Sequence, residues 1–248
     1  MTLELFDRNV YLGEFTARVV RNSGREIVLD RTAFYPGGSG QPPDQGWLNV
    51  GPVNAKVIEV RRAGSDDDLE DAYEDESGGE YKDDGIEDDS IEDDERAASA
   101  EVIHVLDQAI PRTVREVSAT LDWPRRHRNM RYNTALSLLL AAVRRDLGAG
   151  SAVGRIRSTR ARLDLLRTAV PVDDAGVRKA ESAVNGAISG GLEVSLRGGF
   201  SVAGFPPGEA GGLYVRNTSE IGRIELTRWM DRGSRGIRLE FTIPETEG

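Results

Sequence analysis

One helical stretch in the middle of the chain constrains the fold more than any other feature. In residues 131–143, RYNTALSLLLAAV, apolar side chains recur every three or four positions, which predicts an amphipathic helix. Asn133 and Ser137 are four residues apart, so their side chains lie one turn apart on the same face. Helices hold two metal ligands with this spacing, although an amide and a hydroxyl are not the usual ligands of zinc. The stretch therefore predicts the geometry of a metal site without its ligands.

Around this stretch, the second half of the chain predicts an α+β layer over residues 124–248. A helix is expected over Arg125–Leu147, ending at Gly148, and a second over Asp174–Ser189, with Asp173 as its N-cap. Strands are expected between residues 148 and 162 and over three further segments, Leu192–Leu196, Gly222–Leu226 and Ile237–Phe241. Elements in this order favour an antiparallel sheet with its helices on one face.

The first half, residues 1–123, predicts a small β-barrel. Short apolar runs alternate with polar turns and with a loop rich in glycine and proline, Tyr35–Pro43. Strands are expected at Glu26–Asp30, Trp47–Val50, Ala55–Val60, Val102–Leu106 and Val114–Leu121. Residues 65–96 contain 18 acidic and 2 basic residues, and such a run cannot bury enough apolar surface to fold. We expect a disordered acidic insertion within a hairpin, acting as a solvating loop or as an interaction segment.

Outside this insertion the chain is basic, and arginine supplies nearly all of the positive charge. The whole chain has a formal net charge of −10, but the residues outside 65–96 include 24 acidic and 30 basic ones. Only three residues are lysines, and many acids with few lysines resemble the composition of proteins from a salt-rich cytoplasm. Arginine forks suit phosphate oxygens, so arginines near the ends of the central helix are candidates for binding phosphate groups. They are Arg125, Arg126, Arg128, Arg131, Arg144 and Arg145. A surface that uses arginine only in place of lysine is the alternative.

The residue types that the chain lacks exclude several kinds of site. It has no cysteine, and therefore no disulfide, thiolate ligand or thiol nucleophile. Its only histidines are His104 and His127, too few for a closed zinc site of histidine and cysteine. We expect His104 to be packed within a strand and His127 to lie at the surface or on a phosphate. No apolar run is long enough to span a bilayer, which favours a soluble, cytoplasmic protein.

Three blocks of the sequence resemble the AlaX family, the free-standing relatives of the editing domain of alanyl-tRNA synthetase. Residues 29–42, LDRTAFYPGGSGQP, resemble the family pattern LDRTAFYPEGGGQP. Residues 131–139, RYNTALSLL, resemble HTALHLL, and residues 209–226, EAGGLYVRNTSEIGRIEL, resemble CGGTHVxNTSEIGxIxI. Shorter matches at 162–164 and 180–185 extend the resemblance over nearly the whole chain outside the insertion.

The resemblance implies a tRNA-directed activity, in which the six arginines named above would bind tRNA, but the family's metal ligands are replaced. The family hydrolyses mischarged tRNA, typically serine on alanine tRNA, and holds zinc with histidine and cysteine. Its four ligand positions correspond to Asn133, Ser137, Ala210 and Tyr214, none of which is a usual zinc ligand. The resemblance thus implies the family's fold, whereas these residues predict that no zinc or other cofactor is bound.

The resemblance also implies a substrate pocket around the glycine-rich loop. Thr32 would contact the hydroxyl group of a mischarged serine, and Gln41 would line the site. Three glycines of this loop lack a Cβ and would let the backbone approach a ligand closely, although an ordinary tight turn also explains them. They are Gly37, Gly38 and Gly40.

Functions of different classes remain open from the sequence alone. The first is an aminoacyl-tRNA hydrolase that is independent of zinc and positions water with backbone amides of the glycine loop. Glu220 is its candidate catalytic group, although acids in turns such as Asn217–Glu220 often have a structural role. The second is a tRNA-binding relative that has lost catalysis, and the third is a pocket for a small ligand or a protein-interaction module. Salt dependence of tRNA binding separates the second from the third.

Overall fold

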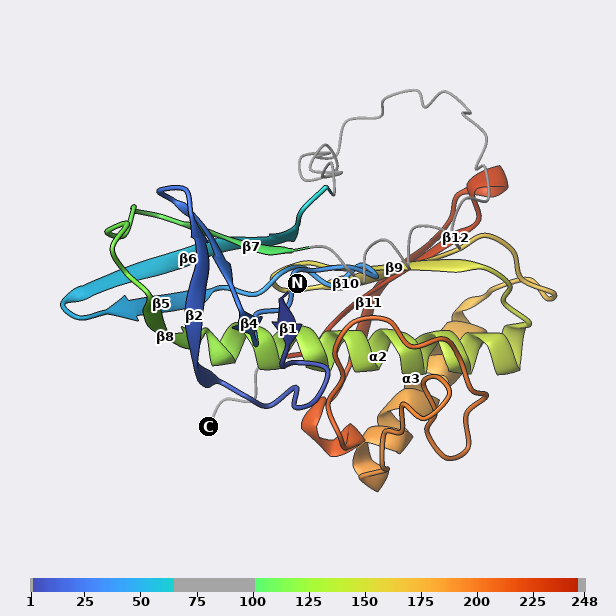
Figure 1. The fold of residues 1–248 in the computed structure, drawn as a ribbon. Helices are drawn as coiled ribbons and strands as arrows, with labels where there is room; N and C mark the ends of the chain where they lie inside the picture. Colours follow the sequence, from blue (N-terminus) through green and yellow to red (C-terminus); the bar gives the residue numbers. More distant parts are fainter. Residues whose placement is uncertain (1, 65–100, 245–248) are drawn as a thin grey trace.

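The computed structural model describes residues 2–64 and 101–244 of the 248-residue chain. Within these residues, a β-barrel is followed by two helices and an antiparallel sheet (Figure 1). This α+β arrangement confirms the predicted fold class. The acidic insertion predicted over residues 65–96 lies outside the described residues.

Six antiparallel strands close the barrel in the order β2–β3–β7–β6–β5–β8. Their bounds are Glu14–Asn22 (β2), Glu26–Leu29 (β3), Gly46–Val50 (β5), Val53–Arg62 (β6), Val102–Leu106 (β7) and Glu116–Leu121 (β8). Side chains alternate across each strand, so one set, including Ile27, Leu48 and Leu106, fills the barrel interior. Two short strands, β1 (Leu3–Glu4) and β4 (Arg31–Thr32), form a separate parallel pair.

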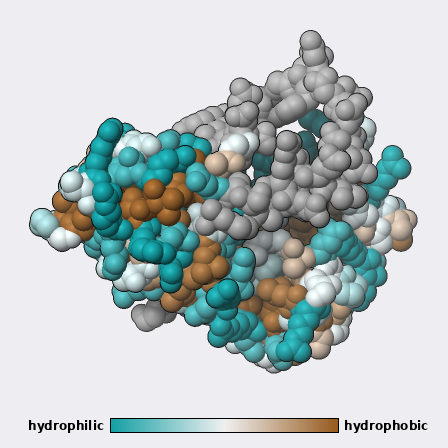
Figure 2. All heavy atoms as spheres, in the orientation of Figure 1, coloured by the Kyte–Doolittle hydropathy of each residue, from teal (hydrophilic) through white to brown (hydrophobic). Residues whose placement is uncertain are grey.

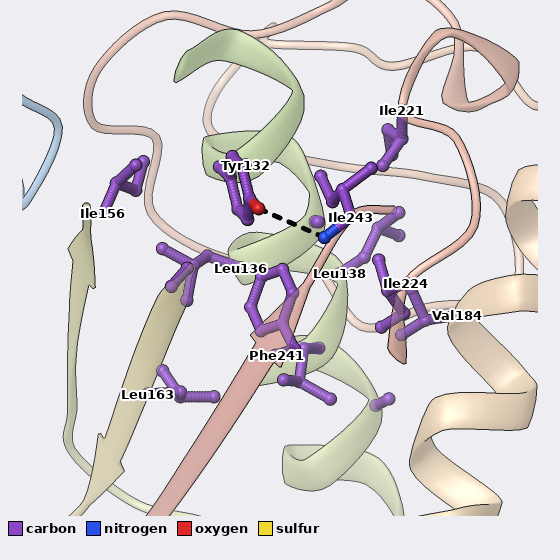
Figure 3. Packing of buried hydrophobic residues seen from close by; sticks show 14 of the residues in the cluster. Tyr132, Leu136, Leu138, Ile156, Leu163, Val184, Ile221, Ile224, Phe241 and Ile243 are labelled. Carbon is purple, nitrogen blue, oxygen red and sulfur yellow. Dashed lines mark hydrogen bonds between the residues drawn. The ribbon is translucent and has the colours of Figure 1, made fainter. Parts of the chain in front are cut away.

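The second half forms a four-stranded antiparallel sheet in the order β11–β12–β10–β9. The strands are Ala152–Ile156 (β9), Ala161–Leu165 (β10), Glu225–Asp231 (β11) and Ile237–Thr242 (β12). Helices α2 (Trp123–Leu147) and α3 (Asp174–Gly190) lie on one side of this sheet (Figure 1). Leu163 and Phe241 of the sheet pack with Tyr132 and Leu136 of α2 in one hydrophobic cluster (Figure 3). A second hydrophobic cluster fills the barrel.

Helix α2 runs along both the barrel and the sheet (Figure 1). It begins at Trp123, two residues before the predicted start, because the side chain of Asp122 accepts a hydrogen bond from the backbone N of Arg125 at 3.1 Å. It ends at Leu147 as predicted, where Gly148 adopts the left-handed conformation with φ of 60°. The predicted N-cap of α3, Asp173, is also confirmed, with its Oδ1 2.8 Å from the backbone N of Gly176.

Two predicted strands are corrected by the structure. Leu192–Leu196 makes only isolated bridges to loop residues, from Glu193 to Asn217 and from Ser195 to Ser201, so no strand ladder forms. The strand predicted over Gly222–Leu226 begins only at Glu225. The backbone N and O of Ile224 are bonded instead to the side-chain amide of Asn185, both at 2.9 Å, and therefore cannot pair with a strand.

A buried ion pair joins the barrel to helix α2. Arg126 is fully buried, and its guanidinium donates through Nε and Nη2 to Oδ2 of Asp44, with Nε at 2.8 Å. It also donates to the backbone carbonyls of Val10 and Ala33. Oδ2 of Asp44 further accepts from the backbone N of Tyr35 at 2.7 Å. Burying these two charges is costly unless hydrogen bonds replace those lost from water. The bonds that do so fix the position of the start of α2 against the barrel.

On the face that Figure 2 shows, hydrophobic side chains form separate patches between hydrophilic ones. Within residues 2–64 and 101–244, no helix is long and apolar enough to cross a membrane.

Candidate functional site

A cavity of about 450 Å³ lies between helix α2, the glycine-rich loop, strand β9 and the loop over residues 206–211. This volume is in the range that holds small ligands. Its walls include apolar side chains, among them Leu136, Leu140 and Phe200. Among the described residues that line it, Arg144 is the only cation and Glu209 the only acid. The cavity is therefore nearly neutral, with polar groups at a few defined points.

All four positions that correspond to the family's zinc ligands line this cavity, namely Asn133, Ser137, Ala210 and Tyr214. Asn133 donates through Nδ2 to the carbonyls of Gly211 at 2.8 Å and Leu213 at 3.2 Å. Ser137 Oγ donates to the hydroxyl oxygen of Tyr214 at 3.3 Å, which also accepts from the backbone N of Gly211 at 3.0 Å. The two helix side chains thus bond the loop through direct or tyrosine-mediated hydrogen bonds. We call Asn133, Ser137, Tyr214 and Gly211 the loop network.

The loop network does not fit a zinc ion. Its side chains supply an amide, an aliphatic hydroxyl and a phenol, and Ala210 supplies no donor atom, whereas zinc sites use imidazole, thiolate and carboxylate. The ring of Tyr214 is buried and packs on Phe200, with ring centroids 5.2 Å apart. Among the residues that the structure describes, no group of three or more histidine, cysteine, aspartate or glutamate residues could hold a metal. The donor set therefore gives no basis for a zinc-dependent step here.

A tight turn of the glycine-rich loop reaches the cavity. The backbone N of Gln41 donates to the carbonyl of Gly38 at 2.9 Å, and between them Ser39 and Gly40 have φ of 51° and 76°, the signs that a type I′ turn requires. A Cβ on Gly40 would lie 1.9 Å from the carbonyl oxygen of Gly154 in β9, so only glycine fits. Both Ser39 and Gly40 line the cavity. Their backbone N–H groups have no hydrogen-bond partner among the described residues.

Most residues predicted to bind the substrate do not line the cavity. Of the five, only Gly40 does. Gly37 packs against the ring of Pro43, and Gly38 accepts a hydrogen bond from the hydroxyl of Tyr35 at 3.2 Å. Gln41 is buried behind the loop, where its Oε1 accepts from the backbone N of Leu213 at 2.9 Å. Its Nε2 has no partner among the described residues.

Thr32 is placed within the barrel core and has no access to the cavity. It is fully buried, and its hydroxyl lies 2.8 Å from Nε2 of His104 while accepting from the backbone N of Phe34 at 3.1 Å. His104 is also fully buried, as predicted, and its Nδ1 lies 3.1 Å from the carbonyl of Ile27. Burial lowers the pKa of His104 to about 4. A neutral ring fits these partners, with Nδ1–H donating to Ile27 and Nε2 accepting from Thr32.

Glu220 has a structural role and does not line the cavity. It completes the capping box of a short 3₁₀ helix, Thr218–Glu220, by accepting from the backbone N of Asn217 at 3.1 Å. Its carboxylate also accepts from the hydroxyl of Tyr11 at 2.7 and 2.8 Å and lies 3.4 Å from Nε2 of His127. Burial, followed by the hydrogen bond to Glu220, raises the pKa of Tyr11 to about 12. These contacts explain Glu220 without a catalytic role.

The six arginines predicted to bind tRNA differ in their surroundings. Arg126 is buried in the ion pair with Asp44 and cannot reach a phosphate. Arg125 is half-buried and donates to the carbonyl of Pro43 at 3.1 Å, and Arg131 donates to that of Ile221 at 2.6 Å. Arg128 is half-buried, with an Nε that has no hydrogen-bond partner among the described residues.

The last two arginines are neighbours in the final turn of α2. Arg145 is exposed and pairs with Asp146 at 3.0 Å, while its guanidinium also packs over the ring of Phe205. Arg144 lines the cavity instead. The guanidinium of Arg145 is thus already paired with a carboxylate, whereas Arg144 lines the cavity.

Comparison with known proteins identifies the relatives of this chain. No family model matches it. It is 28% identical over 272 residues to the alanyl-tRNA editing protein AlaX-M of Saccharolobus solfataricus, spanning 98% of this chain and 99% of that protein. This chain is a homologue of AlaX-M.

The AlaX-M homologue is also similar to part of a larger class of enzymes. It is 28% identical to the alanine–tRNA ligase of Thermoplasma acidophilum over 92% of its own length, and 29% identical to that of Pyrobaculum neutrophilum over 97%. These matches span only 25% and 27% of the two ligases. The chain therefore corresponds to about a quarter of each ligase and to nearly all of AlaX-M.

Sequence reasoning missed several residues of the cavity. Ser39 occupies a glycine position of the family pattern, and this departure within a matched block was the available signal. Phe200 and Pro206 lie in a segment rich in glycine and proline, and Glu209 opens the third matched block without matching its pattern. Nothing in the sequence signals that this loop folds back onto helix α2.

Proposed function

We propose that this AlaX-M homologue binds the aminoacylated 3′ end of a tRNA in the cavity and does so without zinc. The observation that carries the proposal is the convergence of Asn133, Ser137, Ala210 and Tyr214 on one cavity beside the glycine loop. The family's metal residues are gone, but the space that they would surround is still present. A binding site has thus been kept where the ligands for metal chemistry have not.

The chemistry of the cavity supports binding better than hydrolysis. Hydrolysis of an aminoacyl ester needs an activated water and a group that accepts its proton. Among the described residues, the only acid that lines the cavity is Glu209, which is exposed on a loop. The hydroxyl of Tyr214 and the amide of Asn133 are neutral and hydrogen-bonded to the loop. Such groups can recognise a small polar ligand but do not activate water.

A second candidate function, ester hydrolysis without a metal, is favoured by one observation. The backbone N–H groups of Ser39 and Gly40 lack partners among the described residues, and both residues line the cavity. Donors of this kind stabilise the oxyanion that forms when water attacks an ester. The terminal ribose of the bound tRNA would then have to help position the water, since no described side chain that lines the cavity is suited to this role.

Two measurements test these proposals in the same high-salt buffer. The first is binding of an alanine tRNA whose 3′ end carries serine through a stable amide linkage, and the second is deacylation of the natural seryl ester. We expect binding, and deacylation no faster than the uncatalysed rate, with or without a strong chelator. Deacylation that the chelator abolishes would contradict the proposed absence of zinc. Deacylation that survives the chelator would favour the second candidate.

A cavity-filling variant assigns the binding to this site. Ala210→Trp adds a large ring to an exposed residue that lines the cavity, and Ala203→Trp adds the same ring to an exposed residue that is not among its lining residues. We expect binding to fall at least tenfold for Ala210→Trp and to change less than twofold for Ala203→Trp. Equal binding by both variants would mean that tRNA contacts another part of the surface.

A further inference from the structure

Arg144 is the only cationic side chain among the described residues that line the cavity. Its guanidinium has no hydrogen bond and no ion pair with any residue that the structure describes. Its Nη1 lies 3.6 Å from the point that a Cβ on Gly208 would occupy, so it faces the loop that closes the cavity. Arginine carries five donors in a fixed fork, and here none of them is used by a residue that the structure describes.

The position of Arg144 at a helix end does not by itself explain this arrangement. A cation in the last turn of a helix interacts favourably with the helix dipole, and both Arg144 and Arg145 are in the last turn of α2. Arg145 extends outward, where it pairs with Asp146 and donates to the carbonyl of Gly204. Arg144 is half-buried at the cavity without such partners. The two neighbours thus share the helix-end effect and differ in what they face.

Arg144 also lies at a useful distance from the polar groups of the cavity. Ser137 and Arg144 line the same cavity from the same helix, and seven residues of α-helix rise about 10 Å. An elongated ligand lying along the helix can therefore place a polar group near Ser137 and an anionic group near Arg144.

We infer that Arg144 binds a phosphate group of the ligand and so anchors the phosphodiester end of an acylated nucleotide in the cavity. This inference rests on the proposed function, because it places the acylated ribose and the phosphate of the last tRNA nucleotide at opposite ends of the cavity. The acylated ribose lies toward Ser39, Ser137 and Tyr214, and the phosphate on its 5′ side lies at Arg144. Arginine forks match phosphate oxygens with two parallel hydrogen bonds, and the unused donors of Arg144 are available for them.

The test compares Arg144→Gln with Arg145→Gln, which removes the same charge from the adjacent residue. The probe is an RNA minihelix that carries the acceptor stem of alanine tRNA and serine linked as an amide, with binding measured at several salt concentrations. We expect Arg144→Gln to weaken binding about tenfold, since hydrogen bonds to charged groups are the strong ones. The slope of log affinity against log salt should also fall by about one. Arg145→Gln should change affinity less than twofold, and Arg144→Lys should retain most of the slope.

Different outcomes distinguish this inference from the proposed function. If Arg144→Gln keeps the affinity and slope of the wild type while Ala210→Trp abolishes binding, the phosphate assignment is wrong and the cavity is still the binding site. Equal losses for Arg144→Gln and Arg145→Gln would overturn the inference in favour of a general charge effect. An adenosine nucleoside acylated with serine, which has no phosphate, provides a further arm. Its affinity should be the same for wild type and Arg144→Gln, and a loss there would also overturn the inference.

Discussion

Two sets of buried polar groups lie along helix α2, and they differ in the kind of bond that holds them. Near the start of the helix, Arg126 and Asp44 form a charged pair inside the protein. Two turns further along, Asn133 and Ser137 hold the loop around Gly211 with neutral hydrogen bonds. The first set bonds backbone groups of the matched block at residues 29–42, whereas the second occupies positions that correspond to the family's zinc ligands.

The difference teaches what retained and lost residues mean in this chain. Thr32, in the best-matched block, is fully buried with His104, and the backbone of Ala33 and Tyr35 in the same block bonds Arg126 and Asp44. That block is thus needed to build the barrel and its junction with α2. The four positions that correspond to the family's zinc ligands line the cavity, as does the substituted Ser39. Residues of the first block that match the family pattern therefore hold the fold together here, whereas the substituted residues set the chemistry of the cavity.

The largest effect is expected at the charged junction. Arg126→Met leaves Asp44 buried without its cation, which should lower the free energy of unfolding by about 3–5 kcal/mol. Arg125→Met is the matched control, since Arg125 is half-buried and bonds only the carbonyl of Pro43. It should cost about 1 kcal/mol, as measured by chemical denaturation. Similar losses for both variants would contradict the special role of the junction. If Arg126→Met does not fold, the same measurement is made on Arg126→Lys, which keeps the charge.

A pH effect of intermediate size is expected from His104 in the barrel. Its pKa is lowered to about 4 in the folded protein, whereas an unfolded histidine titrates near its ordinary pKa of about 6.5. Protons therefore bind the unfolded chain first as the pH falls from about 6.5 to 4, and stability is lost by up to about 3 kcal/mol over that range. His104→Gln removes this titration, so unfolding free energies of variant and wild type should converge as the pH falls. Parallel pH curves would show that folding does not lower the pKa of His104.

The smallest effect is expected in the loop network. Tyr214→Phe removes the hydroxyl that accepts from the backbone N of Gly211 and from Ser137, and it should cost about 1 kcal/mol. Ser137→Ala removes only the longer of the two bonds and should cost less. Thermal unfolding measures both. A Tyr214→Phe variant as stable as the wild type would show that the network does not hold the loop.

Much of the fold follows from local sequence patterns. The period of residues 131–143 predicts α2, and Gly148 and Asp173 predict where one helix ends and the next begins. The barrel follows from short strands and turns. The strand predicted over Leu192–Leu196 is absent because loop residues bond its backbone, and the strand predicted from Gly222 begins only at Glu225 because the side chain of Asn185 bonds Ile224. Such partners are distant in sequence and leave no local pattern.

The sequence by itself determined that a β-barrel precedes an α+β layer and that the chain has no cysteine and only two histidines, because both depend on which residues are present and in what pattern. Only the tertiary structure decided which residues face the cavity. Thr32 is buried in the barrel core, Gln41 behind the glycine-rich loop, and Arg126 in its ion pair with Asp44. Ser39 and Arg144, which are no more polar, line the cavity. Burial depends on contacts between residues far apart in the chain, such as Gly40 with Gly154 or Gln41 with Leu213.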